Sequence, residues 1–526
     1  MPLILYLFSL IFPFLYKYSF VITNQYTQIP IVLLYMNPDY LPNDWYVNIS
    51  REFGPRTIFA VYMAFWGKLI GLPLTYFIHY ILTILLTLWA SYNLGVILFR
   101  NRKAAVLSSL TVLFAATYSL GGNMLVTRDF TVTQLALSVS LVSIVLTIKS
   151  KYFFSSILFA ISSYLHPLIG PEVAIICFAS SVFIKRLSVI KSGLIPYFFS
   201  VFPLLFFYLK DVRSDIPTEL KISIVAFMRT PHHFLPAFFP WQDYVSFLTL
   251  LILSLFLITR EKNLIHDNIK KFLLYFCLII CVLIIISLFS IYVFRFYPGI
   301  ILQPFRLTVY IYWFAALVVF NYFYKEIFTG NLPGFFSFLP LFLSDYSRLI
   351  FSGKTDTVAV LLGIFIILIL RKLSIKILLI LLLIFFSLFQ FHEKFNYNSL
   401  YLFPTAETIL AEWVNKNTPN NAIFLVPPEF EKFRLVSERA IVADWKAFPF
   451  QEAAFYEWFL RIRAISGQSE RGRNLTRENA ESGYRNLDID KIFDLSGRYG
   501  VNYFISETEY PALNKIRDGK YKIFKL

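Results

Sequence analysis

Residues 37–45 read NPDYLPNDW and place two carboxylates, Asp39 and Asp44, shortly after an almost wholly apolar stretch at residues 2–20. The chain stays mostly apolar up to about residue 390. Charged side chains are costly at or within a membrane, so a carboxylate pair kept in such a chain is a candidate for chemistry. The segment predicts a membrane protein whose polar site lies in a loop outside the apolar helices.

The composition indicates that lipid is the solvent for most of the chain. Of 526 residues, 57% are hydrophobic and 15% are charged, whereas a soluble domain carries about 25% charged residues. The formal net charge is +16, but residues 400–526 hold 18 Lys and Arg against 17 Asp and Glu. The basic excess therefore lies in short clusters between the apolar runs, which argues against nucleic-acid binding.

Apolar runs near the length of a membrane span, about 17–25 residues, predict most of the helices. They lie at 2–20, 74–99, 104–120, 131–148, 193–209, 243–259, 272–293, 304–324, 355–370 and 375–391. Residues 153–184 predict two short helices broken at His166-Pro167 and Gly170-Pro171, and residues 328–350 predict a broken or partial span. The predicted fold class is an α-helical polytopic membrane protein of about 13 helices with a small C-terminal extracytoplasmic α/β domain.

Short basic loops orient these helices. With the N-terminus in the cytoplasm, every short cluster of Lys and Arg falls on the cytoplasmic side, as the positive-inside rule requires. These clusters lie at 100–103, 149–151, 185–191, 260–271, 325 and 371–376. The predicted domains are residues 1–399, a transmembrane domain with a long first external loop at 21–73, and residues 400–526, an extracytoplasmic α/β domain.

Two regions outside the apolar runs have a secondary-structure pattern of their own. In the first external loop, residues 27–35 and 56–70 each predict a helix lying on the outer leaflet. From about residue 400, helix and strand patterns alternate, which indicates a small α/β domain. The predicted helices are 405–415, 452–465 and 488–499, and the predicted strands are 422–426, 440–443, 501–506 and 521–524.

Three external carboxylates are the candidate catalytic residues. Asp39 and Asp44 are available to take a proton from an acceptor hydroxyl. The alternative is a solvated loop in which Asp44 caps a helix, because Asn-Asp before Trp suits an N-cap. Asp129 lies beside Arg128 in a short external loop, where it either assists the chemistry, caps the helix that starts near Thr131, or pairs with Arg128.

The candidate substrate-binding residues are basic or polar side chains at external helix ends. Arg306 could hold a phosphate bidentately, and its alternative is snorkelling to lipid head groups. His166 breaks an apolar run and either contacts a phosphate or satisfies backbone groups freed by Pro167. The remaining candidates for phosphate or acceptor contact are Arg128, His232, His233, Arg295 and Gln303.

On these residues, the chain resembles the GT-C superfamily of polytopic membrane glycosyltransferases. Within it, the likeness is to an uncharacterised bacterial branch with an HP-containing helix and a DWKAFPF tail, here residues 444–450. The NPD and NDW residues of segment 37–45 match the acidic first-loop position, and Arg128-Asp129 matches a second acidic loop position. Residues 411–428 resemble the start of the soluble tail.

The resemblance implies a membrane glycosyltransferase that transfers a sugar from a polyprenyl-phosphate-linked donor to a glycan, lipid or protein acceptor. It implies the cytoplasmic (inner) membrane, with the acceptor on the extracytoplasmic face. The acidic pair is not a compact DxD or ExD, so a divalent cation, Mg²⁺ or Mn²⁺, stays open as a cofactor. The alternatives are a transporter or flippase of a lipid-linked or anionic substrate, and a non-catalytic membrane assembly protein.

Overall fold

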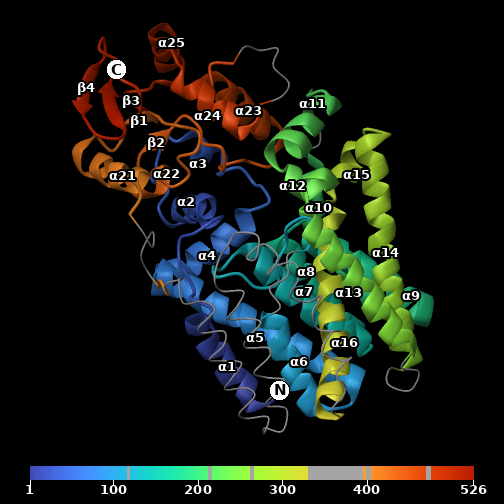
Figure 1. The fold of residues 1–526 in the computed structure, drawn as a ribbon. Coiled ribbons are helices and arrows are strands. Elements are labelled where there is room, and N and C mark those ends of the chain that lie inside the picture. The colour runs from blue at the N-terminus through green and yellow to red at the C-terminus, as the bar shows by residue number, and fades with distance from the viewer. Residues whose placement is uncertain (115–118, 211–215, 261–265, 330–394, 398–403, 469–474) are drawn as a thin grey trace. The chain divides into compact units, whose positions relative to one another are not determined.

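The computed structural model describes residues 1–114, 119–210, 216–260, 266–329, 395–397, 404–468 and 475–526 (Figure 1). The chain divides into two compact units. The helical unit consists of Met1–Ser19, Phe77–Pro203 and Thr230–Tyr397. The sheet unit consists of Phe20–Tyr76, Leu204–Arg229 and Asn398–Leu526.

The helical unit is built from long apolar helices. Helix α7 is buried along nearly all of its length and packs against α8 and α9, and α7 and α8 lie side by side in Figure 1. The bounds are α1 (Leu3–Leu15), α5 (Leu72–Phe99), α6 (Arg102–Phe114), α7 (Val132–Ile148), α8 (Tyr152–Leu165), α9 (Ile169–Val189), η1 (Ile190–Leu194), α10 (Ile195–Lys210), α12 (Pro231–Phe234), η3 (Pro236–Phe238), α13 (Trp241–Arg260), α14 (Asp267–Tyr292), α15 (Tyr297–Ile301), η4 (Pro304–Leu307) and α16 (Thr308–Thr329).

The predicted break at His166-Pro167 is confirmed, because α8 ends at Leu165 and α9 begins at Ile169. The break predicted at Gly170-Pro171 is wrong, because both residues lie in the first turn of α9, where a proline is tolerated. A proline disfavours the helical conformation of the preceding residue, and His166 is extended, with φ −141° and ψ 99°. The His166 Nδ1 atom then accepts a hydrogen bond from the Ile169 N–H at 3.3 Å. A Cβ atom at Gly170 would collide with the backbone of Ser162 and Ser163. Only glycine therefore lets α9 start this close to α8.

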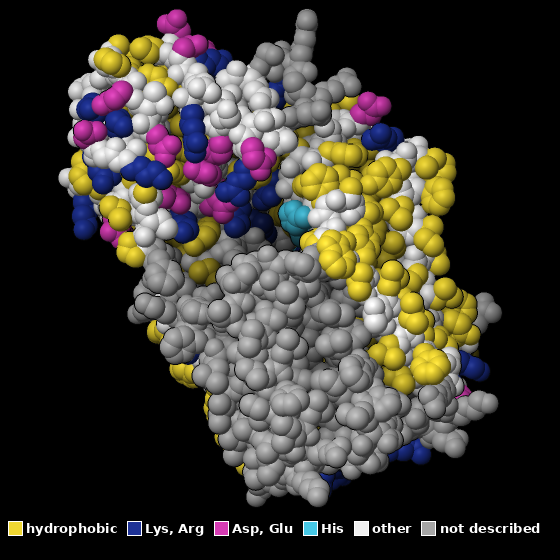
Figure 2. Space-filling model, in the orientation of Figure 1, with side chains coloured by type: hydrophobic (Ala, Val, Ile, Leu, Met, Phe, Trp, Pro, Cys, Tyr) yellow, Lys and Arg dark blue, Asp and Glu magenta, His cyan; other side chains and the backbone are white. Residues whose placement is uncertain are grey.

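Several described helices could cross a membrane by their length and composition. These stretches are Leu72–Phe99, Leu187–Phe206, Asp267–Tyr292 and Tyr297–Val319. Figure 2 shows hydrophobic side chains gathered on the surface over α13 and α14, where Leu278, Ile285 and Phe289 are exposed. The predicted spans at 355–370 and 375–391, and the broken span from residue 330 onward, lie outside the described residues. The total of about 13 helices therefore stays a prediction.

The sheet unit begins with three helices from the first predicted external loop, α2 (Gln25–Met36), α3 (Trp45–Ile49) and α4 (Thr57–Ile70). Helices α2 and α4 correspond to the predicted helices at 27–35 and 56–70. Along α4, Val61, Phe65 and Leu69 are exposed at a spacing of four residues, which forms one apolar stripe. Two further elements, α11 (Thr218–Ile222) and η2 (Ser223–Arg229), also belong to this unit.

The C-terminal part of the unit contains the predicted small sheet. Its strands follow the order β2-β1-β3-β5-β4, with β2, β1 and β3 parallel and β5 and β4 antiparallel to their neighbours. The bounds are α21 (Ala406–Asn417), β1 (Ile423–Leu425), α22 (Phe433–Ser437), β2 (Ala440–Ile441), α23 (Glu452–Ile465), α24 (Arg477–Arg485), α25 (Ile489–Tyr499), β3 (Tyr503–Ser506), β4 (Asn514–Arg517) and β5 (Lys522–Lys525).

Helices cover both faces of this sheet, because successive strand residues point to opposite sides. Phe424 packs with α21 and α22 in one apolar core, whereas Leu425 packs with α23, α24 and α25 in the other. Tyr503 and Phe504 divide between the same two cores. The sheet is thus the middle of three layers, which positions the loops that follow β1 and β2.

The sheet unit is larger than the predicted C-terminal domain at residues 400–526. It also takes in Phe20–Tyr76, most of the predicted first external loop, and Leu204–Arg229. Figure 2 shows Lys, Arg, Asp and Glu side chains intermixed on the surface of its C-terminal part.

We expect Glu407→Gln to stabilise the sheet unit at alkaline pH. The Glu407 Oε1 atom accepts the Lys432 N–H at 2.7 Å, and burial raises the pKa of Glu407 to about 7. Because the folded state binds this proton more tightly than the unfolded state, stability falls as pH rises from about 4.5 to about 7. Glutamine keeps the hydrogen bond without the charge. We expect a gain of about 1–2 kcal/mol at pH 8 and almost none at pH 4.5.

Hydrogen exchange of residues 406–417, corrected for the intrinsic rates, measures this effect. The matched control is Glu412→Gln, which changes an exposed carboxylate on the same helix. Equal protection gains in the two variants at pH 8 would refute the assignment.

Candidate functional site

A buried cluster of three charged side chains lies in the sheet unit and contains the sequence candidate Asp44. Arg434 is 2% exposed and donates from Nε to Asp44 Oδ2 at 2.8 Å and from Nη1 to Asp444 Oδ2 at 2.6 Å. Its guanidinium carbon also lies 5.1 Å from the ring centroid of Tyr46. Burial disfavours this charge, but Asp44 and Asp444 more than compensate, so the pKa of Arg434 is raised above its ordinary value.

Both carboxylates of the cluster also accept hydrogen bonds from backbone N–H groups. Asp44 is the N-cap of α3, since its Oδ1 atom accepts the Val47 N–H at 3.0 Å, and its Oδ2 atom accepts the Ile441 N–H at 3.1 Å. Asp444 Oδ1 accepts the N–H groups of Lys446 and Ala447 at 2.9 and 2.7 Å. Burial raises the pKa of Asp444, and the guanidinium of Arg434 offsets part of that shift.

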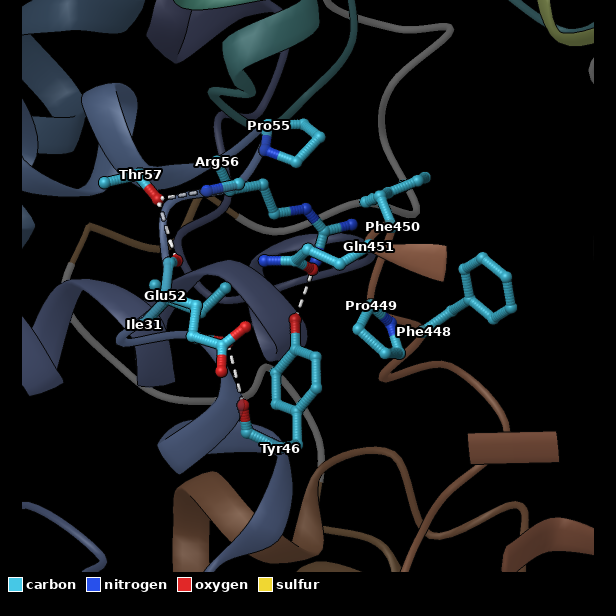
Figure 3. Close-up of a pocket in the computed structure, with 12 residues that line it drawn as sticks. Ile31, Tyr46, Glu52, Pro55, Arg56, Thr57, Phe448, Pro449, Phe450 and Gln451 are labelled. Atoms are coloured by element: carbon cyan, nitrogen blue, oxygen red, sulfur yellow. Dashed lines mark hydrogen bonds between the residues drawn. The ribbon is translucent and has the colours of Figure 1, made fainter. Parts of the chain in front are cut away.

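A pocket of about 310 Å³ of empty volume, part of it open to solvent, lies in the same unit (Figure 3). Two short segments, residues 50–57 and 448–451, supply most of its lining, with Ile31 and Tyr46. Figure 3 shows the Arg56 guanidinium beside the side chains of Tyr46 and Gln451. Arg56 Nη1 donates to the Tyr46 hydroxyl at 2.7 Å, which fixes the cation at the pocket.

The charged cluster holds both walls of this pocket. Asp44 caps the helix that carries Tyr46, and the chain reaches segment 50–57 directly after that helix. Asp444 fixes the turn at residues 446 and 447, which leads straight into Phe448. The two lining segments are therefore positioned by one buried guanidinium, that of Arg434.

The two carboxylates of the opening segment have very different surroundings. Asp39 is exposed in the turn after α2, and its N–H donates to Asn37 Oδ1 at 3.1 Å. Asp44 is fully buried and both of its oxygens accept hydrogen bonds. The helix cap that the sequence offered as an alternative for Asp44 is therefore present. The assignment of either residue as a catalytic base stays a prediction.

A second cluster, in the helical unit, brings together several predicted substrate-binding residues. Arg306 donates from Nε to Asn123 Oδ1 at 2.9 Å and from Nη1 to Gln303 Oε1 at 3.0 Å. Gln303 adopts the left-handed conformation, with φ 49°, just before the short helix η4 that carries Arg306. Both acceptors are neutral, so they orient the guanidinium without cancelling its charge.

The loop of residues 121–123 connects the two histidines to this arginine. The His233 Nδ1 atom lies 2.6 Å from the Gly121 carbonyl oxygen, and the rings of His232 and His233 have their centroids 4.1 Å apart. Gly121 has φ +84°, and a Cβ atom there would lie 3.0 Å from the Arg306 backbone nitrogen. A glycine is thus needed where this loop meets η4.

Glu172 is a carboxylate of this cluster that the sequence analysis did not single out. It lies in the first turn of α9, near enough to Arg306 for the guanidinium to favour its charged form, which burial disfavours. Its Oε1 atom is buried and has no hydrogen-bond partner among the described residues. The sequence does show an acidic residue inside an apolar stretch. Because a charged group is energetically costly in a membrane segment, such a residue is a candidate for function.

The remaining candidates lie at other places in the helical unit. Arg128 donates from Nε to the Lys17 carbonyl oxygen and from Nη2 to Ser19 Oγ, each at 3.1 Å. Asp129 is buried and accepts from Thr127 Oγ1 at 2.8 Å. Helix α7 is capped by Thr131, so the alternative in which Asp129 caps it is wrong. Arg295 is exposed, with φ 51°, after α14.

The described part of the chain contains no cluster of side chains that could serve as metal ligands. No three His, Cys, Asp or Glu side chains there come together as ligands would. Whether a divalent cation, Mg²⁺ or Mn²⁺, acts as a cofactor therefore stays open, as the sequence left it.

Comparisons of the sequence with known proteins cover a limited part of the chain. The family model DUF6798, described as a domain of unknown function, matches residues 405–465. That range includes Arg434, Asp444 and the pocket segment 448–451. No match is found among curated proteins.

Solved structures resemble the whole chain at low sequence identity. ArnT from Cupriavidus metallidurans bound to undecaprenyl phosphate is 12% identical, with a TM-score of 0.54 over 99% of this chain and 97% of that one. The apo state of the same protein gives 11% identity and a TM-score of 0.50 over 99% and 96%. The oligosaccharyltransferase AglB from Archaeoglobus fulgidus, in complex with an inhibitory peptide and a dolichol-phosphate, is 13% identical. Its TM-score is 0.47 over 96% of this chain and 68% of that one. The resemblance to the GT-C superfamily is confirmed at the level of the fold.

Proposed function

We propose that this protein is a membrane glycosyltransferase that transfers a sugar from a polyprenyl-phosphate-linked donor to an acceptor hydroxyl. The observation that carries the proposal is the likeness of fold along 99% of the chain to ArnT bound to undecaprenyl phosphate. The long apolar helices and the cluster around Arg306 support it further. A fold alone does not determine chemistry, so the roles below rest on the geometry of that cluster.

Arg306 is the group proposed to hold the donor phosphate. Its Nε and Nη1 atoms are anchored by Asn123 and Gln303, which leaves Nη2 without a partner among the described residues. A guanidinium held by neutral groups stabilises the negative charge that develops on a leaving phosphate. His232 and His233, in α12, lie against the loop that contains Asn123 and are further candidates for contact with the donor.

Glu172 is proposed as the general base. An acceptor oxygen forms a bond to the anomeric carbon of the sugar, and the bond from that carbon to the phosphate oxygen breaks. Polyprenyl phosphate then leaves as an anion, and the acceptor's proton goes to the carboxylate of Glu172. Displacement from the face opposite the phosphate inverts the anomeric configuration. Asp39, Asp44 and Asp129 stay predicted alternatives for this role, and of these Asp44 already accepts hydrogen bonds at both oxygens.

Transfer from a labelled polyprenyl-phosphate sugar by the protein in proteoliposomes, with cell-envelope material as acceptor, tests the role of Arg306. We expect Arg306→Gln to lower kcat/KM for transfer by about 100-fold, because a charged donor of hydrogen bonds to the leaving group is lost. The matched control is Arg102→Gln, which removes an exposed arginine at the start of α6. Equal rates for Arg306→Gln and the wild type would contradict the assignment.

A further inference from the structure

Two guanidinium groups of the sheet unit lie against one short aromatic segment, residues 448–450. The Arg56 guanidinium carbon lies 5.0 Å from the ring centroid of Phe450, and that of Arg229 lies 5.8 Å from that of Phe448. An arginine over an aromatic ring is attracted by the negative face of the ring. Arg56 itself lines the pocket of Figure 3, whereas Arg229 lies against Phe448, one of the residues that line it.

Neither arginine is neutralised by a carboxylate in the described part of the chain. Arg56 donates to the Tyr46 hydroxyl at 2.7 Å and to Thr27 Oγ1 at 3.3 Å. Arg229 donates to the Lys446 carbonyl oxygen at 3.1 Å, and its buried Nε atom has no hydrogen-bond partner among the described residues. These acceptors are all uncharged, so within the described part of the chain neither positive charge is paired with a carboxylate.

The acidic groups nearest to Arg229 are already engaged elsewhere. Asp444 pairs with Arg434 at 2.6 Å, and Glu431 pairs with Lys446 at 2.9 Å and with Arg477 at 3.2 Å. Burial, and next the charge of Arg56, lower the pKa of Arg229 to about 10, although Asp444 and Glu431 act in the opposite direction. Arg229 is therefore still charged at neutral pH, in an environment that favours an added anion.

A helix terminus adds to the positive potential at the pocket. Arg56 is the N-cap of α4, a helix of 14 residues with no acidic residue in its first turn. The N-terminus of a helix carries a partial positive charge and free N–H groups. Glu52 also lines the pocket, but among the described residues it forms no ion pair with Arg56.

We propose that Arg56 and Arg229 form a binding site for a phosphate ester at this pocket. A phosphate group carries up to two negative charges and several acceptor oxygens, which suits two guanidinium groups better than a single carboxylate would. Gln451 lines the same pocket and offers a further hydrogen-bond donor, whereas the Ser50 hydroxyl already donates to the Tyr46 carbonyl oxygen at 2.8 Å. The site belongs to the sheet unit, whereas the Arg306 cluster belongs to the helical unit, and the proposal does not depend on the proposed sugar transfer.

Binding to the purified full-length protein in nanodiscs tests this site without any assay of transfer. The soluble probe is inorganic pyrophosphate, and the lipid probe is undecaprenyl phosphate included in the nanodisc. We expect Arg56→Gln and Arg229→Gln each to weaken binding about 10-fold or more, which is the loss of one charge-assisted interaction. The matched control, Arg51→Gln, removes an exposed arginine of the same loop and should leave binding unchanged.

The two probes separate the sources of the phosphate. An effect of the variants on pyrophosphate alone identifies a soluble phosphate ester, and an effect on the lipid alone identifies a lipid-linked phosphate. Either result supports the site. Unchanged binding of both probes by Arg56→Gln and Arg229→Gln would overturn it, and so would an equal loss in Arg51→Gln.

A measurement on the wild-type chain covers the case in which a variant fails to fold. Arginine-specific chemical modification, followed by mass spectrometry, reports the reactivity of Arg56 and Arg51 in parallel. We expect the probe to protect Arg56 and not Arg51. Equal reactivity of Arg56 with and without either probe would contradict the proposal.

Discussion

Replacing Glu172 by glutamine should lower the rate of sugar transfer by about 10²–10⁴-fold, the usual contribution of a general base. The substitution preserves the shape of the side chain and removes its ability to take a proton. Because Glu172 Oε1 has no hydrogen-bond partner among the described residues, the fold should tolerate the change. We expect the melting temperature to stay within a few degrees of the wild type, and the donor KM to change far less than kcat.

Two further variants distinguish a base from a structural residue at this position. Glu172→Asp keeps a carboxylate at the site and should retain more activity than Glu172→Gln. Asp267→Asn changes an exposed carboxylate at the start of α14 and should transfer sugar at the wild-type rate. Full activity in Glu172→Gln would show that Glu172 is not the general base. Asp39, Asp129 and Asp44 would then be the remaining candidates for that role.

Replacing Arg434 by methionine should destabilise the sheet unit by about 3–5 kcal/mol, because a buried cation that separates two buried carboxylates is removed. Methionine fills a similar space, so packing changes little. Asp44 and Asp444 are 0% and 1% exposed, and without Arg434 water cannot easily stabilise either charge. We also expect weaker phosphate binding at the pocket, since both of its walls are held by this cluster.

The loss of unfolding free energy is measured by chemical denaturation, with hydrogen exchange of residues 423–447 as the readout. Arg498→Met, at an exposed position of α25, is the matched control and should cost less than about 1 kcal/mol. Adding Asp44→Asn and Asp444→Asn to Arg434→Met should recover part of the stability, because the unpaired charges are removed. Equal losses of unfolding free energy in Arg434→Met and Arg498→Met would contradict this role of the cluster.

Helix breaks and strands that are determined by residues close together in the sequence could be predicted from it. Proline makes the break at His166-Pro167 predictable, because it removes an N–H group and restricts the residue before it. Strands β1, β3 and β5 are short apolar runs at predicted places. Strand β4 was missed because Asn514, Lys515 and Arg517 are polar and the strand is an exposed edge. The Asp518-Gly519 turn that follows it was the available hairpin signal.

The candidate site could be predicted only in part, because its charges are arranged by distant contacts. Asp39 and Asp44 look alike in the sequence, yet one is exposed and the other is buried against Arg434, 390 residues away along the chain. Arg434 lies in a charged stretch that reads as a solvated surface. By contrast, Gln303 and Arg306 are three residues apart, and their contact follows from a single turn of chain.

Sugar transfer itself is the most direct test of the central claim. The purified protein in proteoliposomes should move label from a polyprenyl-phosphate sugar to cell-envelope acceptor, and both Arg306→Gln and Glu172→Gln should abolish most of that transfer. The result that would contradict the account is the absence of any transfer from a full panel of polyprenyl-phosphate sugars by a correctly folded wild-type protein.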